Sequence, residues 1–333
     1  MKKSKTYYLP FQLLPLFLMI QLSVPQQALS QKDSGNQVIK ITGTRLTFPI
    51  FQRWSEEYTK LHPQIKILVK SGIPSASADI LIVSHHLGST DVKEGQAAIA
   101  ITRYLQLPII NSQRDNVSTL QSDGFTEDEL KKVYFQGNSD DYILPPEYHF
   151  VVYKREKPAC ASIALANHFG QQQVDIKGVG IEGDDQDLLE AVKKDVKAIS
   201  YNNLGFIYDI QTRKVVDGIA IIPIDFNENG KIDEDEKIYS TLDLVLQYAE
   251  KTNNPKLFLE NVNVIVQKNS RKEVIDFLQW VLKYGQRYNH AYGFLNLDKK
   301  QIASEKEFLS NIHSANSGNS SKSISTNYHV SND

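Results

Sequence analysis

The sequence has 333 residues, 41% of them hydrophobic, with 37 basic and 39 acidic side chains. That length is enough for two lobes or domains, and the near balance of charge excludes the basic character that marks nucleic-acid-binding proteins. Cys160 is the single cysteine, which excludes an intramolecular disulfide, so core packing has to hold the chain together. We expect a monomer that does not bind nucleic acid.

The N-terminus has the pattern of a secretory signal. Lysines at positions 2, 3 and 5 precede a mostly apolar run over residues 7–24, and small residues follow at 28 and 30. A membrane anchor is the alternative, but two prolines, two glutamines and a serine interrupt the run and weaken a membrane span. We therefore expect residues 1–30 to be a signal peptide that exports the protein to the periplasm or the cell envelope.

The first third of the chain alternates strands with a helix. Apolar and polar residues predict a strand over 37–42, an amphipathic helix over 49–61, and strands over 65–69 and 80–83. This alternation is the signature of an α/β fold with a parallel sheet. Two further apolar runs, 97–101 and 107–110, predict two more strands.

The rest of the chain continues the α/β pattern. The sequence Thr126-Glu-Asp-Glu129 is a capping box, which predicts that a helix begins there. The remaining expected elements are strands over 150–153, 219–224 and 262–266 and helices over 128–134, 160–169, 188–194, 241–249 and 273–288. Residues 314–333 are rich in Ser and Asn and poor in apolar residues, which predicts a disordered tail.

A twelve-residue segment directly after the expected strand 219–224 matches the loop pattern of EF-hand calcium sites. It has glycine at position 6 for a left-handed turn and glutamate at position 12 for bidentate binding. The expected ligands, with Lys231 contributing only its carbonyl, are Asp225, Asn227, Asn229, Lys231, Asp233 and Glu236. A solvated acidic loop is the alternative. Because a strand enters the loop, we expect a structural Ca²⁺ clip and no conformational switch.

Four segments in this order resemble the phosphate-binding proteins of ABC phosphate transporters, within the type II periplasmic binding-protein superfamily. They are Thr42–Pro49, Gly124–Gly137, Ala198–Asn203 and Phe277–Gln286 with the following 292–295. A branch of that family also carries an inserted Asp-x-Asn-x-Asn-Gly-Lys-Ile-Asp loop at the place of Asp225. The likeness covers residues 37–300.

The resemblance implies a two-lobed α/β protein with a ligand cleft between lobes that two crossover strands join. The crossovers are expected near 111–116 and 254–262. The first lobe would then comprise residues 36–112 and 260–310, and the second lobe 113–259.

The resemblance also implies an anion site at helix N-termini, where backbone N–H groups and hydroxyls favour negative charge. In the first lobe the matching positions are Thr47 and the Phe48 backbone, although helix capping also explains Thr47. The family's Gly-Ser-Gly turn is reduced here to a segment that retains Ser71 and Ser75 as hydroxyl donors.

Three further positions follow from the resemblance. Ser84 and His85 follow the strand 80–83, where His85 contacts the anion if protonated or otherwise lies in a solvated turn. Arg155 keeps the place of a family arginine that forks onto an oxyanion, although a surface run of charges is the alternative. Glu156 would repel phosphate if it faced the cleft, and Cys160 is interpreted as a small buried residue at a helix start.

We expect an exported solute-binding protein that captures phosphate or a similar oxyanion for an ABC permease. The alternative is a binding-protein scaffold that has lost its ligand and acts as an interaction protein in the cell envelope. No nucleophile, base and acid arrangement with a recognisable context occurs in the sequence, so we expect no enzymatic activity.

Overall fold

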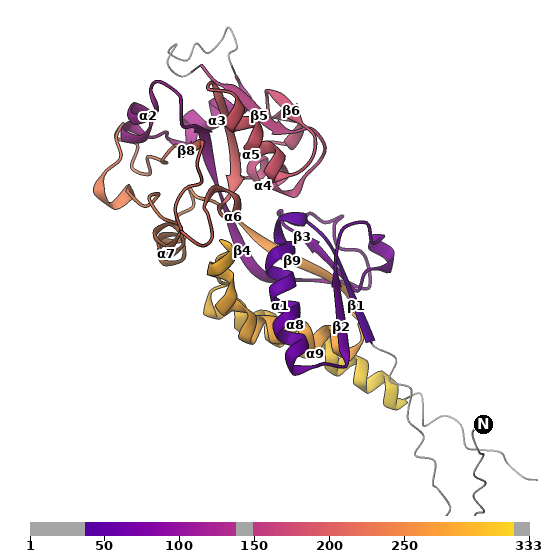
Figure 1. Cartoon of the computed structure of the whole chain (residues 1–333). Helices are drawn as coiled ribbons and strands as arrows, with labels where there is room; N and C mark the ends of the chain where they lie inside the picture. The colour runs from indigo at the N-terminus through magenta and orange to yellow at the C-terminus, as the bar shows by residue number, and fades with distance from the viewer. Residues whose placement is uncertain (1–36, 138–148, 323–333) are drawn as a thin grey trace, which may run out of the picture. The chain divides into compact units, whose positions relative to one another are not determined.

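The computed structural model describes residues 37–137 and 149–322 (Figure 1). The strands are β1 (Gln37–Gly43), β2 (Ile65–Val69), β3 (Ile80–Val83), β4 (Gln96–Asn111), β5 (Val151–Arg155), β6 (Val179–Ile181), β7 (Ala198–Asn203), β8 (Ile219–Ile221) and β9 (Phe258–Gln267). The α-helices are α1 (Phe48–Leu61), α2 (Val117–Asp123), α3 (Glu127–Phe135), α4 (Cys160–His168), α5 (Asp185–Lys194), α6 (Leu204–Ile207), α7 (Leu242–Thr252), α8 (Lys272–Tyr284) and α9 (Lys299–Lys322). The expected signal peptide, residues 1–30, lies outside the described residues.

The strands form a mixed sheet in the order β2-β1-β3-β9-β4-β7-β5-β6, with β8 paired to β4. At one end β1 runs parallel to β2 and β3, and at the other end β5 runs parallel to β6 and β7. Between these parallel groups lie β4 and β9, which are antiparallel to each other from Gln96↔Gln267 to Gln106↔Phe258. The chain therefore has the mixed α/β class expected from its alternating pattern.

The long strand β4 corrects the expectation of two separate strands over 97–101 and 107–110. Four of the five residues between the two apolar runs carry polar side chains, and donors of these side chains reach partners elsewhere in the fold. Thr102 Oγ1 donates to the Leu295 carbonyl at 2.7 Å, and Gln106 Nε2 donates to the Ala161 carbonyl at 3.0 Å. Tyr104 donates its hydroxyl to the Ser84 carbonyl at 2.7 Å. Because these partners come from distant segments, the local sequence gave the appearance of a break where the strand continues.

Two hydrophobic clusters form the core, and β4 and β9 contribute residues to both. The first cluster gathers β1, β3, α1 and α8 around residues such as Ile41 and Trp54. The second cluster gathers α3, α5, β7 and α7 around residues such as Tyr134 and Ile199. Along β4 the first cluster ends at Tyr104 and the second begins at Leu105. The chain thus passes from one cluster to the other inside β4, between Tyr104 and Leu105, and inside β9, between Phe258 and Val262. The expected crossovers near 111–116 and 254–262 stay predictions.

The C-terminal segment also differs from the expectation. Helix α9 runs to Lys322, so the backbone of residues 314–322 is helical where the Ser- and Asn-rich composition predicted disorder. Leu309 and Ile312 of this helix pack in the first cluster, which anchors it despite a weakly apolar sequence. The last part of the expected tail, residues 323–333, lies outside the described residues.

The capping box that the sequence predicted begins α3. Thr126 Oγ1 accepts a hydrogen bond from the Glu129 amide at 3.2 Å, and Glu129 Oε2 accepts one from the Thr126 amide at 2.8 Å. Thr126→Ala should therefore lower the free energy of unfolding by about 1 kcal/mol, measured by urea denaturation. Thr126→Ser keeps the hydroxyl and is the control; equal stability of the Ala and Ser variants would contradict a capping role.

Candidate functional site

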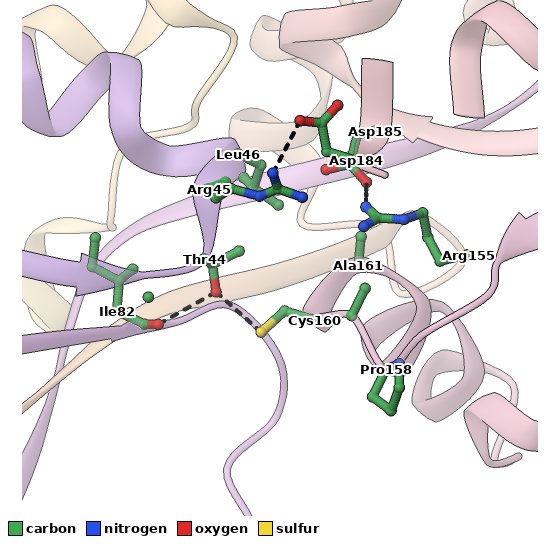
Figure 2. Close-up of a pocket in the computed structure, with 12 residues that line it drawn as sticks. Thr44, Arg45, Leu46, Ile82, Arg155, Pro158, Cys160, Ala161, Asp184 and Asp185 are labelled. Atoms are coloured by element: carbon green, nitrogen blue, oxygen red, sulfur yellow. Dashed lines mark hydrogen bonds and ion pairs between the residues drawn. The ribbon is translucent and has the colours of Figure 1, made fainter. Parts of the chain in front are cut away.

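A cavity of about 310 Å³ lies where segments of both clusters meet, and we call it the arginine cavity (Figure 2). Its wall is built from the segment after β1, the start of α4, the start of α5 and the ends of β3 and β5. The lining residues are Gly43, Thr44, Arg45, Leu46, Ile82, Arg155, Pro158, Ala159, Cys160, Ala161, Asp184 and Asp185. The N-termini of two helices therefore meet at this cavity; Asp184 caps α5, whereas α4 has no side-chain cap and its N-terminus favours anions.

A close approach of two backbones shapes the first wall. Gly43 adopts φ +128°, and a Cβ placed on it would lie 2.2 Å from the Ile82 carbonyl oxygen. The next amide, Thr44 N–H, donates to that same carbonyl at 3.1 Å. Because only glycine tolerates both the conformation and the contact, Gly43 lets the chain turn directly from β1 into the short 3₁₀ helix η1 (Arg45–Thr47).

Two arginines from different parts of the chain converge on one carbonyl. Arg45 Nη2 donates to the Gly183 oxygen at 3.2 Å, and Arg155 Nη2 donates to the same oxygen. Each guanidinium also has a carboxylate partner: Arg45 Nη1 lies 3.5 Å from Asp184 Oδ2, and Arg155 Nη1 lies 2.9 Å from Asp185 Oδ1. Figure 2 shows both arginine–aspartate pairs at the same wall of the cavity.

The two pairs differ in their exposure to water. Arg45 and Asp184 are half-exposed, so solvent screens their attraction. The Arg155 and Asp185 side chains are only 11% and 10% exposed. Burial raises the pKa of Asp185 and the Arg155 guanidinium opposes this, with a net pKa above the usual range. Arg155 thus partly offsets the unfavourable burial of the Asp185 carboxylate.

Cys160 is the first residue of α4 and lines the cavity instead of filling the core. Its Sγ atom accepts a hydrogen bond from Thr44 Oγ1 at 3.0 Å and lies 3.2 Å from His85 Nδ1. The side chain is only partly buried. The interpretation of Cys160 as a buried packing residue is therefore corrected, because the helix start faces an opening.

The structure brings two of the expected anion-site residues to this region. Arg155 lines the cavity, and His85 contacts it through Cys160. Ser84 is fully buried, and its hydroxyl has no hydrogen-bond partner among the described residues. Glu156, which we expected to repel phosphate if it faced the ligand, is exposed and outside the lining.

The other expected anion-site residues lie outside the lining. Thr47 is fully buried and donates its hydroxyl to the Thr44 carbonyl at 2.7 Å, and Phe48 begins α1 behind it. Ser71 and Ser75 are exposed, the latter in the short 3₁₀ helix η2 (Ser75–Ser77) that stands where a longer helix was expected. These four residues stay predictions from the resemblance and receive no support from the geometry.

Sequence reasoning missed four lining residues: Thr44, Arg45, Asp184 and Asp185. In the sequence Asp184 and Asp185 shortly precede the helix expected over 188–194, and in the structure Asp184 caps α5 through the Gln186 amide at 3.0 Å. A signal for Thr44 and Arg45 was present, since polar residues at the carboxyl end of a parallel strand commonly form sites. Both directly follow β1 at its C-terminal end.

The calcium-like loop has the turn that its motif requires. Gly230 adopts φ +81°, and the buried carboxylates of Asp225 and Glu236 accept hydrogen bonds from loop amides. Lys231 Nζ, however, lies 2.9 Å from Asp233 Oδ1. No group of three His, Cys, Asp or Glu side chains in residues 37–137 and 149–322 is arranged to hold a metal ion. The other Asp233 oxygen accepts hydrogen bonds from the Asn227 and Asn229 side-chain amides. The oxygen donors suit Ca²⁺, and calcium stays a prediction.

If the loop binds Ca²⁺, millimolar CaCl₂ should raise the melting temperature of the protein and EDTA should reverse the rise. A free Ca²⁺ concentration of 100 Kd stabilises a protein by about 2.7 kcal/mol, which is roughly 4 °C for a chain of this size. Asp225→Asn should abolish the Ca²⁺-dependent shift, whereas Asp235→Asn, an exposed loop position outside the ligand pattern, should keep it. A wild-type melting temperature that ignores both reagents would refute the site.

Several solved structures resemble this chain. The chain aligns with a phosphate ABC transporter substrate-binding protein of Clostridium perfringens with bound phosphate, at a TM-score of 0.57 and 15% identity, covering 79% of this chain and 100% of that one. An ABC-type phosphate transport receptor from Vibrio cholerae aligns at a TM-score of 0.53 and 13% identity, covering 78% of this chain and 100% of that one. PstS from Borrelia burgdorferi aligns at a TM-score of 0.50 and 14% identity, covering 79% of this chain and 100% of that one. The fold is that of a type II periplasmic binding protein.

These similarities establish the fold and confirm the two-lobed α/β architecture that the motif order predicted. At this identity they do not extend to the ligand. No protein-family model matches the chain, and no curated protein matches it. In the described part of the chain, no helix combines the length and apolar character needed to cross a membrane.

Proposed function

We propose that this chain is an exported solute-binding protein that captures phosphate or a related oxyanion and delivers it to an ABC permease. The observation that carries the proposal is the convergence of Arg45 and Arg155 on the Gly183 carbonyl. A guanidinium group presents a planar fork of donors that matches an oxyanion. Two such forks at one point, from segments of both hydrophobic clusters, form a clamp for an anion.

The helix starts strengthen the clamp. Helix α4 begins at Cys160 and helix α5 at Asp185, and both ends line the arginine cavity. The α4 start has no side-chain cap, so its N–H groups place partial positive charge beside the two guanidinium groups, whereas Asp184 caps the α5 start. An oxyanion at this position would replace the Gly183 carbonyl as the shared acceptor of Arg45 and Arg155.

Asp184 and Asp185 favour an oxyanion that carries a proton. A carboxylate accepts a hydrogen bond from the P–OH group of hydrogen phosphate, whereas sulfate is fully deprotonated at neutral pH and is repelled. The presence of two aspartates in the lining thus argues for phosphate over sulfate. The structural relatives described as phosphate receptors agree with this choice.

One observation favours the alternative of a non-transport interaction protein. Both arginines already have carboxylate partners, at 3.5 Å for Arg45 and 2.9 Å for Arg155, so the cavity is electrically balanced without a ligand. A scaffold that no longer binds an anion would keep such pairs. Titration distinguishes the two functions.

Isothermal titration of the full chain with phosphate near pH 7.5 tests the proposal. We expect one site per chain and at least about tenfold weaker binding of sulfate, a difference of about 1.4 kcal/mol. Arg45→Met should weaken phosphate binding at least about tenfold. Arg53→Met, which removes an arginine of α1 paired with Glu57 outside the cavity, should not. No heat up to about 1 mM phosphate would refute transport and favour the scaffold.

A further inference from the structure

Two side-chain donors lie against the sulfur of Cys160. Thr44 Oγ1, which also lies 3.3 Å from the Ile82 carbonyl oxygen, is 3.0 Å from Sγ, and His85 Nδ1 lies 3.2 Å from it. The residue begins the nine-residue helix α4, so the helix N-terminus adds partial positive charge. A neutral thiol needs no such set of donors, whereas a thiolate is stabilised by each of them.

The charges around the pair favour transfer of the thiol proton to His85. The hydrogen bond with Cys160 raises the pKa of His85 more than burial lowers it. Asp91 Oδ2 lies 3.8 Å from His85 Nε2, and Glu260 of β9 also favours the imidazolium. Burial raises the pKa of Cys160. Interactions with His85, Thr44 and Ser84 lower it by more, so the net pKa lies below the usual value. Tyr104 faces the pair as a buried neutral phenol, because burial holds its pKa far above the usual one.

The sulfur is open to small molecules. Cys160 and Thr44 both line the arginine cavity, and Figure 2 shows the thiol and the Thr44 hydroxyl side by side at its wall. A cavity of about 310 Å³ admits a small polar reagent. The site thus combines a stabilised thiolate, a proton donor and a route of entry.

We propose that Cys160 is a redox-modification site whose thiolate, paired with the His85 imidazolium, is oxidised to a sulfenic acid by a small hydroperoxide that enters the cavity. The oxidation step itself uses no phosphate, although Cys160 lines the cavity in which phosphate is proposed to bind. His85 acts as a positioning residue and proton donor for this step.

The proposed step balances in atoms and electrons. The thiolate sulfur attacks the distal oxygen of the hydroperoxide, the S–O bond forms, and the O–O bond breaks. The sulfur loses two electrons and the peroxide gains them. The leaving hydroxide or alkoxide takes the proton from His85 Nδ1, which gives water or an alcohol and a neutral imidazole. Because Cys160 is the single cysteine, no second thiol of the same chain converts the product to a disulfide.

The pH profile of alkylation tests the thiolate. An unperturbed thiol with pKa near 8.5 is only about 0.3% ionised at pH 6, and a lower pKa increases that fraction while reducing nucleophilicity. We expect iodoacetamide to modify the folded full chain at pH 6 at least about tenfold faster than the urea-unfolded chain. Thiolate absorbance near 240 nm should titrate in parallel. Equal rates in the two states would overturn the proposal.

Matched variants assign the effect to His85. His85→Gln should move the alkylation profile to higher pH and reduce the rate at pH 6 about tenfold, whereas His86→Gln, an exposed neighbour, should leave it unchanged. Circular dichroism is the control that checks that each variant is folded. With stoichiometric hydrogen peroxide, the wild type should gain one oxygen and a dimedone adduct, and Cys160→Ser neither. A wild-type chain that gains no oxygen, or a His85→Gln profile equal to the wild type, would overturn the proposal.

Discussion

Replacing Gly43 with alanine is expected to destabilise the protein by at least about 3 kcal/mol. Strained backbone conformations cost about 1–3 kcal/mol each, and Gly43 at φ +128° is in a region that side chains rarely adopt. The added Cβ would also lie 2.2 Å from the Ile82 carbonyl oxygen, so β1 and β3 would have to separate. Because Thr44 follows directly, the wall of the arginine cavity should move as well.

Gly72→Ala is the matched control for this prediction. Gly72 also has a positive φ, +80°, but nothing lies within 4 Å of a Cβ built there. It should therefore show only the conformational cost, about 1–2 kcal/mol. Urea denaturation followed by tryptophan fluorescence suits the comparison, because Trp54 and Trp280 both lie in the first cluster with β1. Equal losses in the two variants would contradict the close packing of Gly43 against Ile82.

Replacing Arg155 with methionine is expected to cost about 3 kcal/mol at neutral pH, the range found when one partner of a buried ion pair is removed. The change leaves Asp185 buried and charged without its guanidinium partner 2.9 Å away. It also removes half of the proposed anion clamp, so phosphate affinity should fall with stability. Chemical denaturation followed by circular dichroism measures the first effect, and titration the second.

The stability deficit of Arg155→Met should shrink as the pH falls. Burial already holds the pKa of Asp185 above its usual range, and loss of the arginine raises it further. A raised folded-state pKa means that the destabilisation is fully present above that pKa and disappears as the pH falls below the unfolded pKa of about 3.9. The double variant Arg155→Met/Asp185→Asn should recover most of the loss at pH 7. A deficit that neither low pH nor the double variant relieves would contradict the ion-pair explanation.

Local patterns in the sequence predicted most helices and strands because each signal is short-range. The helix expected over 49–61 begins one residue earlier, at Phe48, and ends at Leu61, where the amphipathic pattern of buried Phe51, Trp54 and Tyr58 stops. The strands 65–69 and 80–83 have the predicted bounds. Strand β4 could not be read as one strand, because distant residues satisfy the polar groups at Thr102 and Gln106.

The candidate site was predicted less completely than the fold. The resemblance pointed to Arg155 and His85, but it placed the first-lobe contacts at Thr47 and Phe48, and the structure places Thr44 and Arg45 at the cavity. The reason is geometric: η1 turns the chain so that Thr47 faces inward and donates to the Thr44 carbonyl. Spacing along a loop does not reveal which side chains face a cavity until the partner segment is known.

The calcium-like motif shows the opposite relation between sequence and site. Its spacing is the clearest signal in the chain, yet its loop carboxylates already accept hydrogen bonds from loop amides, and Asp233 pairs with Lys231. The arginine cavity has no contiguous motif, because its residues come from five separate segments. The proposed function therefore rests on residues that no linear pattern connects.

A crystal structure of the full chain grown with millimolar phosphate tests the central claim most directly. We predict tetrahedral density in the arginine cavity, with Arg45 and Arg155 donating to its oxygens and at least one of Asp184 and Asp185 within hydrogen-bond distance of it. Phosphate bound elsewhere, or a cavity in which Arg155 still bonds to Gly183 and Asp185 with no anion between the arginines, would contradict it.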